Sequence, residues 1–454
     1  MKKLSGRALF PLILTLVLLA GTVVLGIRYF AKADEWVTFA GSPHVYTGVN
    51  LDGGMVYDRD GTLLLDSTDG RVYSADAATR TTTMHLLGDR YGYIQAPLLG
   101  QFADDMIGFD KINGLYGAED TEAKATLTLS AAVQNAAYAA LGSYHGTVGV
   151  YNYKTGEILC AVTSPSYDPD NMPDVDADTS GKYDGVYVNR FFQATYTPGS
   201  IFKLVTLAAA IETMPELETM TFTCEGETII GGQRIICEGV HGTIGVKEAL
   251  AHSCNVAFGE LAEQLGKKTL MEYARKLGLT ERAECDGITV RAGSVDLTDA
   301  DSGDVAWAGI GQHTDQVTAY AFLRAMGIVA GGGEAAEPYL MQEVVRGEAA
   351  TYTAKETSTG RALKQETAQK LRELMRNNVA TIYGDWQFGG LNVCAKSGTA
   401  EHEGETADAM FAGFCQDEQC PLAFVVFVEN GGSGSAVAAP IAARVLQACA
   451  AEMQ

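Results

Sequence analysis

The sequence predicts an α+β protein in which an apolar amino-terminal helix and a small β-rich segment precede a larger domain. Three observations support this prediction. Residues 8–27 carry no charge, residues 34–122 are rich in Gly, Asp, Thr and Tyr, and helix and strand patterns alternate from Thr128 onward. At 454 residues with 47% apolar content, the chain is long enough for about two domains with a sizeable core.

The apolar run Ala8–Ile27 predicts a helix that spans a membrane. Its 20 uncharged residues extend about 30 Å as a helix, which matches the hydrocarbon thickness of a bilayer. Three basic residues precede the run: Lys2, Lys3 and Arg7. Because basic residues favour the cytoplasmic side, residues 1–7 are predicted to be a cytoplasmic tail, residues 8–27 the anchor, and everything after Arg28 extracytoplasmic.

A cleaved signal peptide is the alternative explanation of this run. Ala31-Lys32-Ala33 has the small-residue pattern of a cleavage site. The apolar core is longer than that of a usual signal peptide, which favours an uncleaved, single-pass anchor in the cell membrane.

Residues 28–122 are predicted to form a small β-rich domain that stands between the membrane and the rest of the protein. The stretch Gly54–Leu65, with the letters MVYDRDG near its start, alternates in polarity and indicates strands joined by turns.

Residues 123–454 are predicted to form the larger domain. The expected elements, in order, are an alanine-rich helix at 131–141, a hairpin at 147–162, an apolar and therefore buried helix at 202–212, strands at 391–395, 409–414 and 423–428, and a closing helix at 438–450.

Three short motifs follow one another along this larger domain. They are Ser200-Ile201-Phe202-Lys203, Ser253-Cys254-Asn255 and Lys396-Ser397-Gly398-Thr399. Each supplies one part of a site for acyl transfer: a serine nucleophile with a lysine one helical turn on, a hydroxyl and amide pair, and a basic strand edge. The first two motifs are weak signals when each stands alone, the third is much rarer by chance, and the three in this order are specific.

Ser200 and Lys203 have the spacing of a nucleophile and its base. Residues three apart share one face of a helix, and Pro198-Gly199 brings Ser200 to the start of the buried helix, where the backbone dipole favours negative charge. A lysine acts as a base only when neutral, which requires burial or a nearby cation to lower its pKa. The apolar neighbours of Lys203 supply the burial, and Lys396 is a candidate for the cation.

The third motif has the composition of a carboxylate-binding strand. Gly398 lets a ligand lie close to the backbone, and the Lys396 ammonium with the hydroxyls of Ser397 and Thr399 can bind a carboxylate.

The motifs and their surroundings resemble class B penicillin-binding proteins, a family of penicillin-recognising serine enzymes. The resemblance includes Gly149–Pro169, the stretch from Asn189 to Ser200, Gly309-Ile310-Gly311-Gln312 and the end of the chain, so it covers roughly residues 123–454. It implies the fold of β-lactamases and transpeptidases, an antiparallel sheet flanked by helices, and a chemistry without a cofactor.

The resemblance also implies roles for the motif residues. Ser253 would relay a proton to or from the amines, and Asn255 would hydrogen-bond the substrate's backbone amide. Lys396 would hold the terminal carboxylate of the substrate together with the substrate-binding residues Ser397, Gly398 and Thr399. The backbone N–H groups of Ser200 and Thr399 would form the oxyanion hole. The implied function is a peptidoglycan D,D-transpeptidase in which Ser200 attacks the penultimate D-alanine of a stem peptide, and which β-lactams acylate.

Two other functions share these motifs. A membrane-tethered serine β-lactamase or D,D-carboxypeptidase would pass the acyl group to water, but such hydrolases usually carry the first motif near the start of the mature chain. A non-catalytic β-lactam sensor is expected to have more membrane spans than the single one predicted here. A non-catalytic cell-wall scaffold is expected to have lost part of the three motifs, all of which are present in this chain.

The expected partners follow from the same resemblance. They are peptidoglycan stem peptides, β-lactam antibiotics, the cell membrane and a polytopic membrane glycan polymerase, because residues 28–122 are too few to hold a glycosyltransferase domain. The net charge of −23 argues against nucleic acid, which demands a basic patch.

The nine cysteines leave their oxidation state open. Cys224 with Cys237, and Cys415 with Cys420, flank short turns, so each pair is either a local disulfide or two buried thiols. We expect no metal site, because the cysteines lack paired C-x-x-C spacing and the seven histidines show no H-E-x-x-H pattern. Of the neighbours of Ser253, His252 is expected to be exposed or structural and Cys254 to pack as a small apolar side chain.

Overall fold

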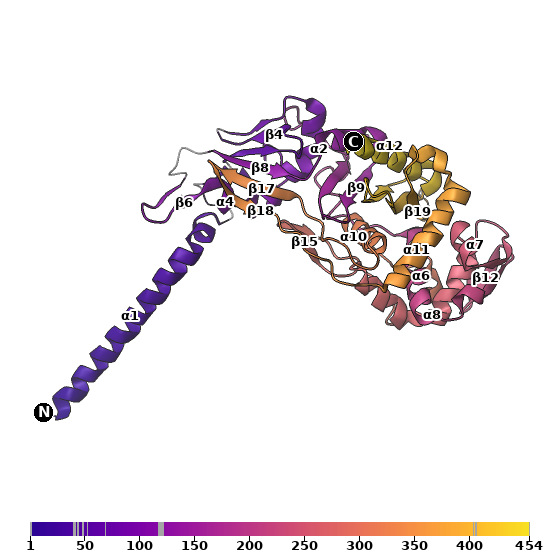
Figure 1. Cartoon of the computed structure of the whole chain (residues 1–454), viewed down its shortest axis with the longest axis horizontal. Coiled ribbons are helices and arrows are strands. Elements are labelled where there is room, and N and C mark those ends of the chain that lie inside the picture. Colours follow the sequence, from indigo (N-terminus) through magenta and orange to yellow (C-terminus); the bar gives the residue numbers. More distant parts are fainter. Residues whose placement is uncertain are drawn as a thin grey trace.

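The structure, a computed structural model, describes residues 2–39, 42, 45–47, 50–51, 53–68, 70–116, 122–402, 404 and 406–453. Figure 1 shows a long amino-terminal helix that projects from a body in which a smaller sheet lies beside a larger α+β domain. The predicted α+β class is confirmed, with strands and helices mixed along the larger domain.

The projecting helix α1 (Lys2–Val37) contains the predicted apolar run. Its segment Ala8–Ala33 is long and apolar enough to cross a membrane, and no part of that segment's most apolar stretch is buried in the protein. Two hydrogen bonds join the end of α1 to the turn around Lys111: the Tyr29 hydroxyl donates to the Lys111 carbonyl at 2.9 Å, and Lys111 Nζ donates to the Phe30 carbonyl at 3.0 Å. A second apolar segment, Gly434–Glu452, is half buried, as expected of a core helix.

The smaller sheet has six strands in the order β18-β17-β8-β3-β4-β5. Strands β3 and β8 are parallel and the other pairs antiparallel. The bounds are β3 Met55–Tyr57, β4 Leu63–Asp66, β5 Val72–Tyr73, β8 Ala123–Leu127, β17 Met341–Arg346 and β18 Ala349–Thr353. Three of these strands lie after residue 122, so the sheet crosses the predicted boundary between residues 122 and 123, which itself stays a prediction.

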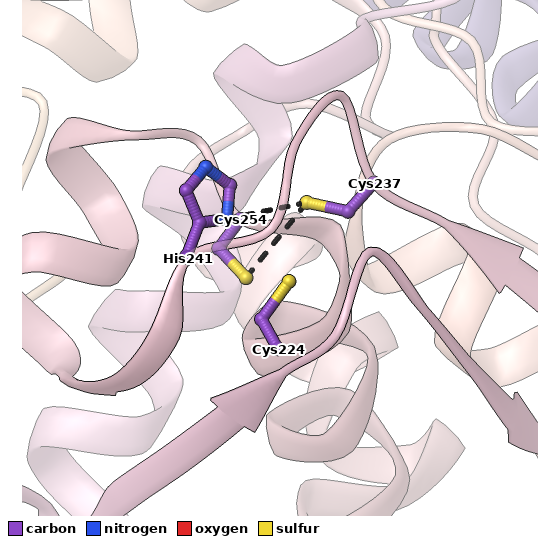
Figure 2. A group of neighbouring side chains, drawn as sticks. All are labelled: Cys224, Cys237, His241 and Cys254. Atoms are coloured by element: carbon purple, nitrogen blue, oxygen red, sulfur yellow. Dashed lines mark hydrogen bonds between the residues drawn. The ribbon is translucent and has the colours of Figure 1, made fainter.

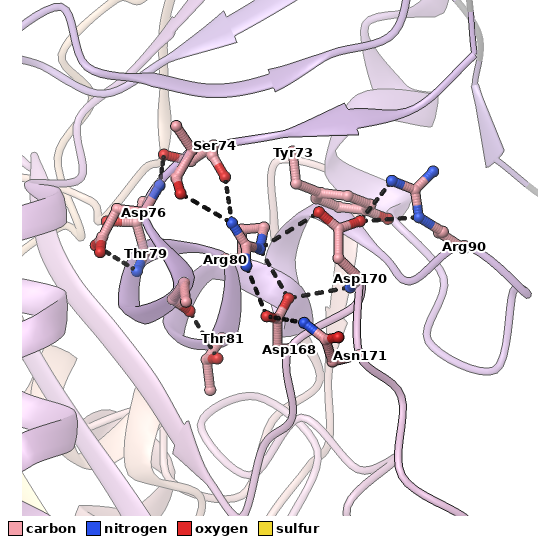
Figure 3. Close-up of polar contacts among 12 residues, drawn as sticks. Tyr73, Ser74, Asp76, Thr79, Arg80, Thr81, Arg90, Asp168, Asp170 and Asn171 are labelled. Carbon is pink, nitrogen blue, oxygen red and sulfur yellow. Dashed lines mark hydrogen bonds and ion pairs between the residues drawn. The ribbon is translucent and has the colours of Figure 1, made fainter.

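Helix α2 (Ala77–Leu87) joins this sheet to the larger domain through a network of charges (Figure 3). Arg80 donates through Nε and Nη2 to the two carboxylate oxygens of Asp168, both at 2.7 Å. Arg90 donates to Asp170 at 2.9 Å through Nε. The residues on the two sides of this network are about 80 positions apart in the chain, so it is a tertiary contact between the two parts of the protein.

The larger domain is built on a five-stranded antiparallel sheet in the order β10-β9-β21-β20-β19. The bounds are β9 Gly146–Asn152, β10 Ile158–Ser164, β19 Val393–Ala400, β20 Asp408–Cys415 and β21 Leu422–Val428. The predicted hairpin and three late strands are therefore confirmed, with β19 extending through the whole third motif. The strand order places β19 at one edge of the sheet.

Helices cover both faces of this sheet, which is why its strands are almost continuously apolar. In β20, Phe411 packs in a core with α5 (Ala131–Leu141) and α12 (Ala439–Glu452). The alternate residues Met410 and Ala412 face a second core. That core includes α6 (Lys203–Thr213), α8 (Asn255–Lys276) and α10 (Ala319–Ala330).

The remaining elements connect these layers. Near the sheets they are β1 Tyr46–Thr47, β2 Asn50–Leu51, α3 Pro97–Gln101, α4 Ala103–Ile107, β6 Phe109–Asp110, β7 Leu115–Tyr116, β15 Ala283–Cys285 and β16 Ile288–Val290. Around the motifs they are β11 Thr221–Cys224, β12 Glu227–Ile230, β13 Gln233–Ile236, β14 Gly242–Gly245, α7 Val246–Ala251, α9 Ser302–Gly309 and α11 Gln365–Asn378.

Candidate active site

Ser200 lies in a tight 3-10 turn, Gly199–Phe202, that leads directly into α6. The prediction placed it at the start of the helix; in the structure the turn comes first and α6 begins at Lys203. Lys203 is completely buried, whereas Ser200 is half-buried. The two heads meet as expected, with Lys203 Nζ 2.8 Å from Ser200 Oγ.

Glycines hold the Ser200 turn against a neighbouring segment. Gly199 has a φ of 54° and its N–H donates to the Gly311 carbonyl at 2.8 Å. A Cβ on Gly311 would lie 1.9 Å from the Gly199 carbonyl oxygen, so the two backbones approach too closely for any side chain. This contact explains why the stretch Gly309-Ile310-Gly311-Gln312 accompanies the first motif.

Ser253 lies between α7 and α8, Asn255 is the first residue of α8, and both contact Lys203. Lys203 Nζ is 2.7 Å from the Ser253 carbonyl oxygen, 3.0 Å from Ser253 Oγ and 2.6 Å from Asn255 Oδ1. Ser253 has a φ of 54°, which is costly for a residue with a side chain. That backbone conformation is therefore maintained by the surrounding contacts.

Burial lowers the pKa of Lys203 well below the usual value of a lysine, and the positive charge of Lys396 lowers it further. A neutral amine has two N–H groups and one lone pair. The Ser253 carbonyl and Asn255 Oδ1 are acceptors that use the two N–H groups, which leaves the lone pair free to accept the Ser200 hydroxyl proton. Lys203 thus has the position of a base, and its lowered pKa favours the neutral form that a base needs.

Lys396 lies on the edge strand β19 and is also completely buried. Its Nζ is 3.0 Å from Ser253 Oγ and 2.8 Å from the Ser397 carbonyl oxygen. Burial lowers the pKa of Lys396 to about 7. The Ser253 hydroxyl therefore lies between two lysine amines and is placed to pass a proton.

The edge of β19 lies against the Ser200 turn. A Cβ on Gly398 would lie 3.0 Å from the Pro198 carbonyl oxygen and 3.1 Å from Ile201 Cγ2. Ser397 and Thr399 on either side are half-exposed, and an edge strand leaves alternate N–H and C=O groups unpaired by the sheet. The third motif thus presents backbone and hydroxyl groups next to Ser200.

Tyr383, which the sequence analysis did not identify, orients Ser397. Its hydroxyl lies 2.9 Å from Ser397 Oγ and accepts the Ser397 backbone N–H at 2.9 Å. Tyr383 ends a π-helical turn, Val379–Tyr383, that follows α11. No motif marks this tyrosine, because an aromatic residue after an amphipathic helix is usually only part of the core.

Of the neighbours of Ser253, His252 is exposed as expected, whereas Cys254 is buried but also makes polar contacts through its sulfur. His252 is exposed and its ring stacks on His241 at a centroid distance of 5.3 Å. Cys254 is buried, and its Sγ accepts the Ala257 N–H at 3.5 Å, which caps α8. All nine cysteines are buried free thiols in the structure, which corresponds to the second of the two alternatives left open for the Cys224–Cys237 and Cys415–Cys420 pairs.

Residues 146–447, more than half of the chain, match the sequence profile of the penicillin-binding protein transpeptidase domain. Among curated proteins, the peptidoglycan D,D-transpeptidase PbpA of Mycobacterium tuberculosis is 29% identical over 354 residues, 71% of each chain. The stage V sporulation protein D of Bacillus subtilis is 29% identical over 332 residues, which cover 67% of this chain and 49% of that protein.

Solved structures give the same result. The crystal structure of PBPA from Mycobacterium tuberculosis superposes with a TM-score of 0.75 at 26% identity, covering 87% of this chain and 99% of that chain. Its acyl-enzyme complex with penicillin G superposes with a TM-score of 0.74 over the same shares. A D,D-transpeptidase domain from Eggerthella lenta, at 23% identity and a TM-score of 0.74, shares the fold over 87% of this chain and 97% of its own.

Proposed function

This chain belongs to the penicillin-binding protein transpeptidase family, and from that membership we propose that Ser200 is the residue that carries the acyl group. The enzyme is a peptidoglycan D,D-transpeptidase that forms acyl-enzymes with β-lactams. One observation carries the assignment of Ser200: its Oγ lies 2.8 Å from the buried amine of Lys203, whose pKa is lowered.

In the first half-reaction, neutral Lys203 takes the proton of Ser200 Oγ as that oxygen attacks the carbonyl of the penultimate D-alanine. The new C–O bond gives a tetrahedral oxyanion. When the oxyanion collapses, the bond to the nitrogen of the last D-alanine breaks. That nitrogen takes a proton that returns from Lys203 through the Ser253 hydroxyl, which lies 3.0 Å from Lys203 Nζ.

In the second half-reaction, the amine of a neighbouring stem peptide attacks the acyl-enzyme carbonyl. Its excess proton passes through Ser253 to Lys203, and the bond to Ser200 Oγ breaks as that oxygen recovers a proton. The same two residues therefore serve as base and acid in turn, as microscopic reversibility requires.

We assign substrate binding to the edge of β19 and to Asn255. Lys396, Ser397 and Thr399 would hold the substrate's terminal carboxylate, and Gly398 would allow its close approach. The N–H groups of Ser200 and Thr399 would bind the oxyanion. Asn255 already donates one amide N–H to the Ile236 carbonyl at 2.8 Å, so its second N–H is the one available to a substrate amide.

For location, we propose that α1 remains as an uncleaved anchor with the transpeptidase domain outside the cytoplasm, where it meets a polytopic membrane glycan polymerase. The exposed apolar segment Ala8–Ala33 supports the anchor. Intact mass spectrometry of the protein from membranes tests it: retention of residues 1–33 supports an anchor, and a new amino terminus just after Ala33 would establish a signal peptide.

Labelling of the full-length protein in detergent with a fluorescent penicillin tests the function. We expect stable labelling of wild type, no labelling of Ser200→Ala, and normal labelling of the control Ser180→Ala, because Ser180 is exposed. Release of the label within minutes would favour a β-lactamase. Folded wild-type protein that takes no label would leave the scaffold as the remaining explanation.

A further inference from the structure

Four side chains with metal-binding atoms gather beside the second motif, in a group that we call the cysteine–histidine cluster (Figure 2). Its members are Cys224, Cys237, His241 and Cys254. They come from the end of β11, the loop after β13, the segment before β14 and the cap of α8. One ligand atom from each lies within 4.8 Å of every other, the three cysteines are buried, and the histidine is half-buried.

The distances inside the cluster fit one tetrahedral ion. With Zn–S bonds of about 2.3 Å and Zn–N bonds of about 2.0 Å, tetrahedral geometry separates two sulfurs by about 3.8 Å, and a sulfur from a nitrogen by about 3.5 Å. Cys237 Sγ lies 3.9 Å from Cys254 Sγ and 3.5 Å from His241 Nδ1. The remaining pairs need only small side-chain movements to reach the same separations.

The surroundings of the sulfurs suit thiolate ligands. The backbone N–H of Asn255 donates to Cys237 Sγ at 3.3 Å, and that of Ala257 donates to Cys254 Sγ at 3.5 Å. Metal ligands need such outer contacts, because a bound thiolate carries a negative charge that amide groups stabilise.

A disulfide within the cluster explains this arrangement less completely than a metal ion does. It would join two of the three sulfurs, leave the third as a buried thiol and give His241 no role. Three sulfurs and one imidazole nitrogen form a common ligand set of structural zinc, and four protein ligands leave no open position for a reacting water.

We propose that the cysteine–histidine cluster binds one Zn²⁺ ion in a structural site. The sequence-based expectation of no metal site rested on spacing along the chain. That argument fails here, because the ligands come from separate elements that only the fold brings together.

The position of the cluster gives the ion a second consequence, which rests on the proposed function. Cys254 stands between Ser253 and Asn255, and Cys237 both accepts the Asn255 N–H and precedes Glu238. Ser253 and Asn255 in turn contact Lys203 Nζ, and Ser253 Oγ also lies 3.0 Å from Lys396 Nζ. A metal ion would therefore fix the groups that position the catalytic lysines.

Metal content of the full-length protein, purified in detergent, tests the site directly. We expect about one zinc per chain by elemental mass spectrometry in wild type, and a loss of at least about tenfold in Cys237→Ser. The matched control is Cys160→Ser, a buried cysteine on β10 outside the cluster, which should keep its zinc. Wild-type protein that takes up no zinc from added ZnCl2, with an intact mass two hydrogens lower, would overturn the proposal in favour of a disulfide.

Variants of His241 keep the test decisive if Cys237→Ser does not fold. His241 is half-buried, so its replacement disturbs the core little. We expect His241→Cys to retain the ion and His241→Ala to bind it at least about tenfold more weakly. Loading the apoprotein with Co²⁺ gives a readout independent of activity, since tetrahedral thiolate coordination produces intense visible bands. Bands identical in wild type and Cys237→Ser would contradict the assigned ligands.

Acylation by a fluorescent penicillin separates this inference from the proposed function. If zinc positions the motif, removing it with a chelator should slow acylation about tenfold, and adding ZnCl2 should restore the rate. Zinc-loaded protein that never reacts with penicillin would refute the proposed function and leave the metal site standing. An unchanged acylation rate in proven apoprotein would refute only the positioning role.

Discussion

At the scale of single residues, the site depends on two buried lysines with different tasks. Lys203 has its pKa lowered well below the usual value, first by burial and then by the charge of Lys396. Burial lowers the pKa of Lys396 to about 7. The Lys396 charge lowers the pKa of Lys203, so Lys203 should lose its proton first as the pH rises. Below about pH 7, where Lys396 is still mostly protonated, a neutral base and a charged carboxylate ligand can then coexist on either side of Ser253.

This pair predicts a bell-shaped dependence of acylation on pH. The rate constant should rise on the acid side as Lys203 becomes neutral, and fall on the alkaline side as Lys396 loses the charge that binds the carboxylate. Both limbs should lie well below the usual lysine pKa, because both pKa values are lowered. Stopped-flow acylation of the wild type between about pH 5 and pH 10 measures both limbs.

The control for the alkaline limb is Lys396→Arg. A guanidinium stays protonated throughout this range, so the alkaline limb should disappear, although the rate should fall because the planar head fits the site less well. An alkaline limb that is unchanged in Lys396→Arg would show that another group titrates there.

At the scale of elements, the site depends on how β19 is held at the edge of its sheet. One side of β19 pairs with β20, and the other faces the Ser200 turn. Tyr383, at the end of its π-helical turn, contacts both the side chain and the backbone of Ser397. The orientation of the carboxylate-binding hydroxyl is thus set by an element outside the three motifs.

Replacing Tyr383 by Phe tests this role. The change leaves the Ser397 N–H without its acceptor, so we expect the free energy of unfolding to fall by about 1 kcal/mol and the KM for a stem-peptide donor to rise more than kcat falls. Tyr151→Phe is the matched control. Among the described residues the buried Tyr151 hydroxyl has no hydrogen-bond partner, so its loss should not reduce stability. Equal effects of both variants would contradict a specific role for Tyr383.

Local patterns predicted the first motif and several elements of the larger domain, since Ser200 and Lys203 are three residues apart and strands such as β21 are apolar throughout. They gave no helix or strand between residues 213 and 390, where the structure has α7 to α11 and β11 to β18. They did not suffice for contacts between distant segments. Tyr383 meets Ser397 across 14 positions of chain without a motif, and the cysteine–histidine cluster draws on four separate elements. Contacts of this kind depend on the order of strands in the sheet and on the paths of the loops, and hydrophobic periodicity along the sequence does not determine either.

At the scale of the whole molecule, the two parts of the protein share strands and charges. Strands β8, β17 and β18 follow residue 122, yet they complete the smaller sheet. The ion pair of Arg80 with Asp168 joins α2 to the loop after β10. The protein should therefore unfold with the two parts coupled, since neither completes its contacts alone.

Replacing Asp168 by Asn measures this coupling. The Arg80 guanidinium hydrogen-bonds the Asp168 carboxylate and holds the pKa of that carboxyl well below its usual range. A depressed pKa stabilises the fold above the unfolded value of about 4, and this contribution is lost as the pH falls further. We expect Asp168→Asn to lower the stability by about 1 kcal/mol at pH 7, and the difference from wild type in Tm to shrink as the pH falls below about 4.

The matched control for this experiment is Glu227→Gln, which removes an ion pair with Arg234. Those two side chains are 48% and 61% exposed, against 16% and 13% for Asp168 and Arg80, so solvent screens their attraction. Glu227→Gln should change the stability by less than about 0.5 kcal/mol at any pH. If the Tm difference of Asp168→Asn stays constant from pH 7 to about pH 3, the junction is held by shape and hydrogen bonding, and its charge does not couple the two parts.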